Sequence, residues 1–272
     1  MAGSGRSGSA GGDGHGTDGG GEGERRSGGG TGLPAGLEAA WGLRGRPAKG
    51  PKRGLSLERI VEAAVRIAAS EGLEAVSMGR VAKELGAAPM SLYRYVGAKG
   101  ELYVLMLEAA MGPPPEDLVA GRGWREGLER WAFAMREGYR RNLWALRVPV
   151  HGPPASPNAI DWWEQGLRAM EGSGLDEGEK ISVILLVSGF VRNELLLAAD
   201  LDAGFRANGV TPQAALEDYA RTLAHLVDPD RHPAISRMLR SGVMNGPDDP
   251  DFDFTFGLGR VLDGVEVLVA RA

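Results

Sequence analysis

The chain contains no cysteine, and its few histidines lie scattered along it. Without cysteine, neither a disulfide framework nor a thiolate metal site can form. No two histidines have a spacing suited to a metal pair. The four are His15, His151, His225 and His232. We therefore expect no metal site and no bound cofactor.

Sequence patterns typical of enzymes are also missing. The glycine-rich stretches near the N-terminus have no preceding strand pattern and no following Lys-Ser/Thr pair, so they do not form a phosphate loop. Ser188 and Gly189 lack the context of a nucleophile elbow. The sequence therefore predicts a protein that is not an enzyme.

Long apolar runs and alternating strand patterns are absent too. The longest apolar run, residues 181–191, is interrupted at Arg192 and is too short to cross a bilayer. The chain starts with glycine, serine and a few charges instead of a charged and then apolar signal segment. We expect an all-α protein that acts in the cytoplasm without membrane contact.

Charge is unevenly distributed, although the formal net charge is only −5 at pH 7. Residues 44–100 hold 11 Lys/Arg against 5 Asp/Glu, a net of +6. The other residues hold the remaining 20 Lys/Arg against 31 Asp/Glu, a net of −11. A basic module joined to an acidic body is typical of a protein that touches nucleic-acid phosphates at one end.

Residues 1–50 contain 19 of the 43 glycines and few large apolar side chains. Such a segment buries too little surface to offset its ordering entropy, so we expect it to be disordered. Two interpretations stay open for the basic residues at its end, a solvated linker or an arm that reaches DNA. These residues are Arg44, Arg46, Lys49, Lys52 and Arg53.

A capped helix, a tight turn and a second short helix follow one another between Val76 and Lys99. Ser77 is the expected N-cap of the first helix, and Gly86 begins the turn. Pro89 takes the first position of the second helix, where its missing N–H costs nothing. This arrangement is typical of a helix-turn-helix whose second helix enters the major groove of DNA.

Further helices are predicted from apolar residues at three- and four-residue spacing and from proline or glycine breaks. Ser56 is the expected N-cap of a helix over 57–70, with Gly72 as the left-handed residue that ends it. A helix over 101–111 follows the motif. The remaining helices are expected near 124–143, 157–170, 177–202, 212–227, 234–241 and 254–271.

Residues 57–111 resemble the DNA-binding domain of the tetracycline-repressor family of one-component regulators. The resemblance is carried by Val81-Ala82-Lys83-Glu84-Leu85-Gly86, by Pro89-Met90-Ser91-Leu92-Tyr93-Arg94-Tyr95-Val96 and by Lys99. A weaker resemblance reaches the C-terminus, where residues 254–258 and 263–266 are similar to the last helix of the subgroup nearest the tetracycline repressor itself.

The composition predicts a disordered tail over 1–50, which lies outside the resemblance. The resemblance implies a DNA-binding head over 51–111 and an effector-binding and dimerisation domain over 112–272. It also implies a homodimer that binds a palindromic operator in double-stranded DNA. A small-molecule effector, which the sequence does not identify, would release that operator. The apolar residues expected to supply the dimer interface are Val183, Leu186, Val187, Leu258, Leu262 and Val265.

The resemblance also assigns DNA contacts by position. The residues at base-facing positions are Pro89, Met90, Ser91 and Arg94. The residues at phosphate-facing positions are Ser77, Tyr93, Tyr95 and Lys99. Arg94 has the chemistry for a bidentate contact to guanine, and the alternative interpretation is a solvated surface residue. Either tyrosine can instead be a core aromatic with its hydroxyl at the rim.

One position departs from the family pattern. The tetracycline repressor uses an arginine of the helix before the turn for base readout, and Gly79 occupies that position here. Arg80 follows, about 100° further round the helix. The operator sequence of the tetracycline repressor therefore cannot be transferred to this chain.

Four residues match, by approximate alignment, places that line the effector pocket of the tetracycline repressor. They are Trp131, Met135, His151 and Trp163. For the tryptophans, a role as core residues is the competing interpretation. Asn193 is a further candidate, because Arg192, Asn193 and Glu194 interrupt the most apolar helix. These three polar residues either face the dimer partner or solvent, or reach the effector.

The magnesium-dependent mode of the tetracycline repressor is not expected. That repressor holds its magnesium–drug complex with a histidine and a downstream carboxylate, and the carboxylate position falls near Leu197 here. Two other functions compete with a ligand-responsive repressor. One is a helical scaffold protein, and the other is a non-specific DNA-binding protein without an effector, which would show steep salt dependence.

Overall fold

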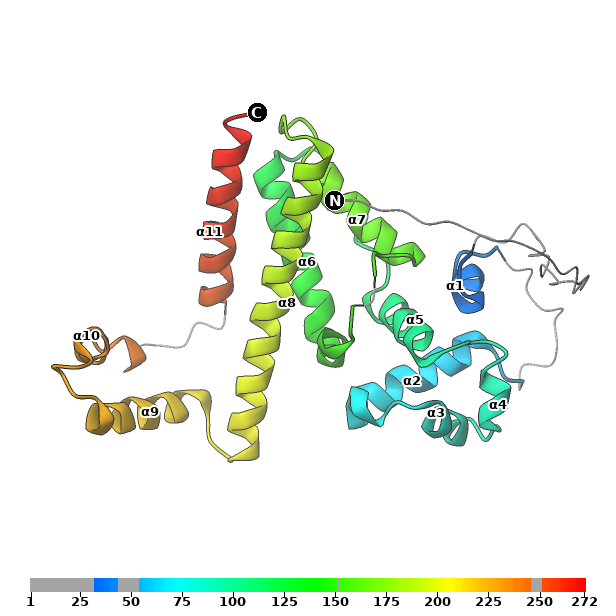
Figure 1. Cartoon of the computed structure of the whole chain (residues 1–272), viewed down its shortest axis with the longest axis horizontal. Helices are drawn as coiled ribbons and strands as arrows, with labels where there is room; N and C mark the ends of the chain where they lie inside the picture. Colours follow the sequence, from blue (N-terminus) through cyan, green and yellow to red (C-terminus); the bar gives the residue numbers. More distant parts are fainter. Residues whose placement is uncertain (1–31, 44–53, 151, 246–250) are drawn as a thin grey trace, which may run out of the picture. The chain divides into compact units, whose positions relative to one another are not determined.

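The computed structural model describes residues 32–43, 54–150, 152–245 and 251–272, and every regular element in these ranges is helical (Figure 1). The α-helices are α1 (Ala35–Ala40), α2 (Leu57–Glu71), α3 (Met78–Glu84), α4 (Pro89–Leu92), α5 (Lys99–Met111), α6 (Trp124–Arg141), α7 (Pro157–Ala169), α8 (Glu177–Ala207), α9 (Pro212–Leu226), α10 (Pro233–Arg240) and α11 (Phe252–Val269). Short 3-10 helices are η1 (Leu73–Ala75), η2 (Leu143–Arg147) and η3 (Val243–Asn245). The predicted all-α class is confirmed.

A first hydrophobic core joins α2, α3, α4 and α5 into a head. The Ser56 side chain accepts the N–H of Arg59 at 3.3 Å, which starts α2 as predicted. Gly72 ends α2 with a φ of 88° and a ψ of 162°, so it is extended with positive φ and not the left-handed helical residue that was expected. The largest side chains fully buried in this core are Ile60, Ile67, Leu92, Leu102 and Met106.

The helix-turn-helix consists of α3, α4 and the turn between them, and its local signals act as predicted. The Ser77 side chain accepts the N–H of Arg80 at 3.1 Å, and Gly86 adopts a φ of 63° in the turn. Pro89 is the first residue of α4. Leu92 and Val96 are fully buried beneath α4, so the opposite side of this short helix faces outward.

A second hydrophobic core lies among α6, α7, α8 and α11. We call the domain built around this core the body. Asp176 and Glu179 form the predicted capping box, and it starts α8 with bonds of 2.8 and 3.0 Å. α8 ends at Ala207, five residues beyond the expected end at 202. The largest fully buried side chains are Leu128, Trp131, Met170, Ile184, Phe254, Leu258 and Leu262.

The helix α5 belongs to the head core and is also bonded to the body. The Glu108 carboxylate accepts the main-chain N–H of Asn158 at 2.9 Å, and the Asn158 amide donates to the Glu108 carbonyl at 3.0 Å. The Trp162 indole N–H donates to the carbonyl of Gly112 at 3.0 Å. These bonds fix the C-terminal end of α5 to α7.

The expectation that all of 1–50 lacks structure is wrong for its last described part. Residues 35–40 form α1, in which Gly36 and Leu37 are buried, and α1 packs on α5. Residues 1–31 and 44–53 lie outside the described residues, and so do His15 and the five basic residues considered as a linker or arm.

Among the described helices, α8 passes a length-and-composition test for crossing a membrane, with a mean hydropathy of 1.8 in its most apolar window. A core helix of a soluble protein passes the same test, so one such helix is weak evidence. The sequence analysis considered only the apolar run 181–191 and therefore underestimated the apolar length of this helix. Its apolar character continues beyond Arg192 and Glu194. One side of α8 packs against α6, α7 and α11.

Candidate functional site

The outward side of α4 presents the residues expected at base edges. Met90 is 75% exposed, and Pro89 and Arg94 are also exposed. Ser91 is half-buried. Among the described residues, no hydrogen bond or ion pair holds the Arg94 guanidinium. Its N–H donors are therefore available to a base edge. The buried Leu92 and Val96 fix the direction in which this surface points.

The expected phosphate contacts differ in how their side chains are placed. Tyr93 is 44% exposed, and the Ser77 hydroxyl accepts a main-chain N–H while its own proton stays available. Lys99 is the first residue of α5 and is exposed, with its ammonium 5.2 Å from the centre of the Tyr103 ring. These three side chains lie at the surface, where a phosphate can reach them.

Tyr95 is placed differently from the other three. It is half-buried, and its hydroxyl donates to the carbonyl of Leu55 at 2.9 Å. A phosphate oxygen needs a donor, and the single proton of the Tyr95 hydroxyl is already given to Leu55. This geometry favours the alternative interpretation of a core aromatic that joins the start of α2 to the end of the helix-turn-helix.

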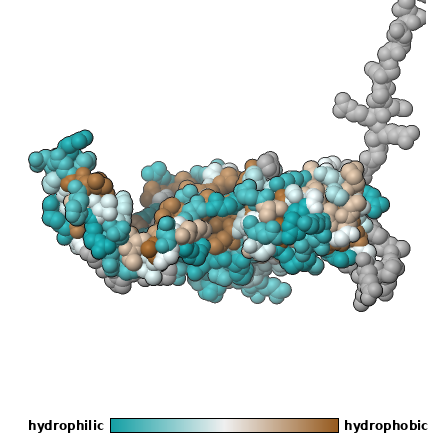
Figure 2. Space-filling view, turned by 90° about the horizontal axis from the view of Figure 1, so that it is seen from below, coloured by the Kyte–Doolittle hydropathy of each residue, from teal (hydrophilic) through white to brown (hydrophobic). Residues whose placement is uncertain are grey.

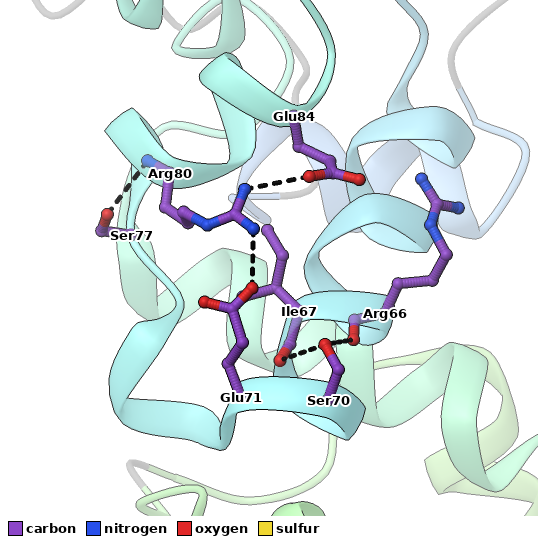
Figure 3. Close-up of polar contacts among 7 residues, drawn as sticks. All are labelled: Arg66, Ile67, Ser70, Glu71, Ser77, Arg80 and Glu84. Atoms are coloured by element: carbon purple, nitrogen blue, oxygen red, sulfur yellow. Dashed lines mark hydrogen bonds and ion pairs between the residues drawn. The ribbon is translucent and has the colours of Figure 1, made fainter.

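Arg80 is engaged within the head (Figure 3). Its guanidinium forms ion pairs with Glu71 at 2.6 Å and with Glu84 at 2.9 Å. The hydrogen bonds from Glu71 and then Glu84 raise the pKa of Arg80 above its ordinary value. Gly79 has open space where a side chain would stand. Helix α3 therefore presents no free arginine at the position where the tetracycline repressor has one.

The residues of the body that were expected to contact the effector do not line one common pocket. Trp131 is fully buried and its indole N–H donates to the carbonyl of Trp162 at 2.8 Å, which favours the interpretation as a core residue. Met135 is buried, with 8% of its surface exposed, and Trp163 is half-buried. Asn193 is exposed on α8, while His151 lies outside the described residues.

A charge cluster around the buried Arg136 in the body was not predicted from the sequence. The Arg136 guanidinium lies 2.6 Å from the Asp251 carboxylate and 3.7 Å from that of Glu194, over the ring of Phe254 at 4.3 Å. Burial raises the pKa of the Glu194 carboxyl, against the nearby Arg136 charge, which lowers it. The available signal was the four-residue spacing of Leu128, Ala132 and Arg136, which puts this arginine in a buried row.

Arg192 also points inward. Its guanidinium donates to the Tyr139 hydroxyl at 2.8 Å and to the carbonyl of Leu146 at 3.1 Å. Of the three polar residues in α8, Arg192 and Glu194 are therefore bound inside the subunit, and only Asn193 is exposed. The possibility that they face the dimer partner or solvent is therefore wrong for Arg192 and Glu194.

The apolar residues that α8 and α11 leave exposed differ from those expected. Val183, Val187, Leu258, Leu262 and Val265 are buried inside the subunit, and only Leu186, at 53%, is exposed. Figure 2 shows apolar surface on the part of the molecule that α8 and α11 form. The large apolar residues exposed on these helices are Ile181, Leu185, Leu186, Leu197, Leu201, Phe252, Phe256 and Val267.

No group of three or more metal-ligating side chains lies together among the described residues. Leu197, at the position of the magnesium-binding carboxylate, is an apolar side chain that is 59% exposed.

A helix-turn-helix head on a larger helical body with an exposed apolar face defines a helix-turn-helix transcriptional regulator. Residues 60–106 match the family model for bacterial regulatory proteins of the tetR family, and residues 119–269 match the model for the tetracyclin repressor-like C-terminal domain. The chain belongs to the tetracycline-repressor family.

Individual relatives agree with this assignment. The chain is 41% identical over 238 residues to the HTH-type transcriptional repressor DrrR1 of Streptomyces coeruleorubidus, which covers 86% of each chain. Apo ActR of Streptomyces coelicolor matches in fold, with a TM-score of 0.66, 24% identity and coverage of 82% of this chain and 99% of ActR. ActR in complex with actinorhodin matches with a TM-score of 0.65, 25% identity and coverage of 79% and 99%.

Proposed function

We propose that this DNA-binding regulator is a dimeric repressor that reads its operator with the exposed side of α4. The single observation that carries the proposal is the exposure of Met90 and Arg94 above the buried Leu92 and Val96. In this assignment the base-facing residues are Pro89, Met90, Ser91 and Arg94. The phosphate-facing residues are Ser77, Tyr93 and Lys99.

The effector is proposed to be a small organic molecule that binds in the body. ActR, a solved relative, is seen in complexes with actinorhodin and with (S)-DNPA. In this chain Met135 and Trp163 stay candidates for effector contacts, and the Arg136–Glu194 pair supplies largely buried polar groups elsewhere in the body. Such groups fix the orientation of a ligand in a mostly apolar pocket.

The remaining parts of the proposal follow from the same assignment. The head covers about 51–111 and the body about 112–272, and the dimer forms through the exposed apolar residues of α8 and α11. The protein acts in the cytoplasm on DNA and has no enzymatic activity of its own. Burying several large apolar side chains against a second copy removes them from water, which stabilises the dimer by about 25 cal/mol per Å² of apolar surface buried.

Substituting Arg94 tests the proposed base readout. Arg94→Ala should relax the preference at one symmetric pair of operator positions, with a loss of about 1–3 kcal/mol of discrimination there. Arg66→Ala, which removes an exposed arginine of α2, is the matched control and should leave the base preference unchanged. Binding profiles of both variants across operator substitutions give the answer. An equal loss of affinity for all sequences in the Arg94 variant would assign Arg94 to the phosphate backbone.

A further inference from the structure

A cavity of about 410 Å³ lies where the head meets the body, away from the body core around Trp131. Its head wall comes from the end of α2 and from Gly72 and Leu73. The opposite wall comes from the end of α6, from the second half of α8 and from η2, whose Trp144 and Ala145 also pack in the core of the head. The segment η2 contacts α2, η1 and α8, so it lies at the centre of this junction.

Every charged side chain that lines this cavity is an arginine. The four are Arg140, Arg141, Arg147 and Arg206. No Asp or Glu is among the lining residues, although the chain as a whole carries a net charge of −5. A concave wall with one sign of charge concentrates ions of the opposite sign.

The ion pairs around the cavity leave this positive charge incompletely balanced. Arg147 pairs with Asp200, Arg141 pairs with Glu137 at 3.4 Å, and Arg140 lies 3.6 Å from Asp251. Arg206 has no ion pair among the described residues. An anion entering the cavity therefore finds at least one guanidinium that no carboxylate occupies.

The rest of the lining is apolar and includes an unsatisfied donor. Leu143, Leu196 and small side chains of α2 and α8 form most of it. Trp144 also lines the cavity, is 7% exposed, and its indole N–H has no hydrogen-bond partner among the described residues. A buried donor without a partner is costly, and an acceptor on a ligand would supply that partner.

We propose that this cavity binds a small amphipathic organic acid, with its carboxylate at the arginines and its apolar body against Leu143, Trp144 and Leu196. Guanidinium groups match carboxylates with two parallel hydrogen bonds. The volume falls within the range of about 300–1,000 Å³ that is usual for small-molecule sites. The side chains of Leu196, Ala199 and Arg206 lie three and seven residues apart on α8, so one face of this helix supplies both the apolar and the charged contacts.

This site also couples ligand binding to the head, an extension that rests on the proposed DNA-binding function. A ligand touching both walls stabilises the arrangement of α2 relative to η2 and α8 in which both walls reach it. It therefore shifts the population toward that arrangement. Because Leu73 lies only four residues before Ser77, the N-cap of α3, the affected end of α2 adjoins the helix-turn-helix. By linkage, a ligand that selects a head arrangement with a different affinity for the operator changes operator binding by the same factor.

The binding arm of the test uses the full chain without DNA and measures 1-naphthoate by calorimetry, with the uncharged 1-naphthamide beside it. The naphthoate should bind at least about tenfold more tightly than the amide. Arg206→Gln should weaken naphthoate about tenfold, and Ala199→Phe, which fills the cavity, should abolish its binding. Arg168→Gln, which removes an exposed arginine of α7, is the control and should bind as the unaltered protein does.

Equal binding of naphthoate and naphthamide, or unchanged naphthoate binding in both Arg206→Gln and Ala199→Phe, would overturn the proposal. The DNA arm adds naphthoate to the operator complex, where affinity should change in the unaltered protein and stay constant in Arg206→Gln. If Arg206→Gln instead weakens DNA binding with a shallower salt dependence and leaves naphthoate binding intact, the arginines contact the DNA backbone and the proposal fails. Failure of the binding arm with intact operator recognition leaves the proposed regulatory function standing.

Discussion

The main-chain N–H of Gly36 donates a 2.6 Å hydrogen bond to Oε1 of Glu101, whose other carboxylate oxygen accepts the N–H of Gly97 at 2.6 Å. Glu101 is only 9% exposed, so one buried carboxylate joins α1 to the turn between α4 and α5. Trp41, directly after α1, donates its indole N–H to the carbonyl of Ala155 at 2.8 Å. The short N-terminal helix therefore ties the head to the segment that precedes α7.

Gly36→Val should destabilise the protein, because a side chain at this position meets Glu101 and Leu105. A Cβ there would lie 2.8 Å from the Glu101 carboxylate and 2.8 Å from a Leu105 methyl group. We expect a loss of about 1–3 kcal/mol in the free energy of unfolding, measured by urea denaturation. Ala39→Val, on the exposed side of the same helix, is the control. If the two variants are equally stable, α1 does not dock on α5 in solution.

Tyr95→Phe and Tyr93→Phe should separate a structural tyrosine from a DNA-contacting one. Removing the Tyr95 hydroxyl loses its bond to Leu55, so the free energy of unfolding should fall by about 0.5–1.5 kcal/mol with operator affinity unchanged. Removing the exposed Tyr93 hydroxyl should do the reverse, with stability kept and operator affinity about three- to tenfold lower. The opposite pattern would restore Tyr95 as the phosphate contact.

The stability contribution of Glu194 should depend on pH in a direction that its raised pKa fixes. Burial raises the pKa of this carboxyl in the folded chain, so the folded state binds its proton more tightly than the unfolded state does. Its contribution is then most favourable below the unfolded value of about 4.3 and declines as pH rises toward the folded pKa. Urea denaturation of the unaltered protein and of Glu194→Gln between about pH 4 and pH 8 isolates this effect. The prediction is contradicted if the free energy of unfolding of the unaltered protein rises relative to that of Glu194→Gln as the pH increases.

The predicted absence of a magnesium–tetracycline mode is testable by calorimetry. The side chain of Leu197 has no oxygen with which to bind a hard cation, which requires oxygen ligands. Tetracycline should therefore give no magnesium-dependent binding heat with this protein. Micromolar affinity that appears only with magnesium would show that other side chains hold the ion.

Leu186→Glu should dissociate the dimer. Leu186 is 53% exposed on α8 beside Leu185, and a carboxylate there would be buried without a partner in the proposed interface. Light scattering at micromolar concentration should give the mass of a dimer for the unaltered protein and of a monomer for this variant. Ile160→Glu, on α7, is a control that should remain dimeric. A monomer mass for the unaltered protein would remove the interface altogether.

Local signals in the sequence were enough to predict most of the helices. Ser56, Ser77 and Asp176 each accept the main-chain N–H of the third residue of the helix that follows, and such caps depend on adjacent residues alone. Helix α1 was missed because a six-residue helix has little stability of its own. Its order depends on Glu101, which is 65 residues away from Gly36 in the sequence.

The candidate site was predictable where one helix defines it and not where several helices meet. The exposure of Met90 and Arg94 follows from the buried spacing of Leu92 and Val96 within one segment. The pairing of Arg136 with Glu194 joins α6 to α8, and no local pattern encodes it. The apolar residues of α8 lie all round the helix, so their period could not tell the buried face from the exposed one.

Selection of DNA from a random duplex library, with the purified full chain at near-physiological salt, tests the central claim most directly. We predict enrichment of one palindrome, with half-sites whose base preference depends on Arg94. Such a result is what a dimer presenting two copies of α4 must produce. Absence of any enriched sequence, with binding that disappears as salt rises, would leave only the electrostatic attraction to phosphates and contradict a sequence-specific repressor.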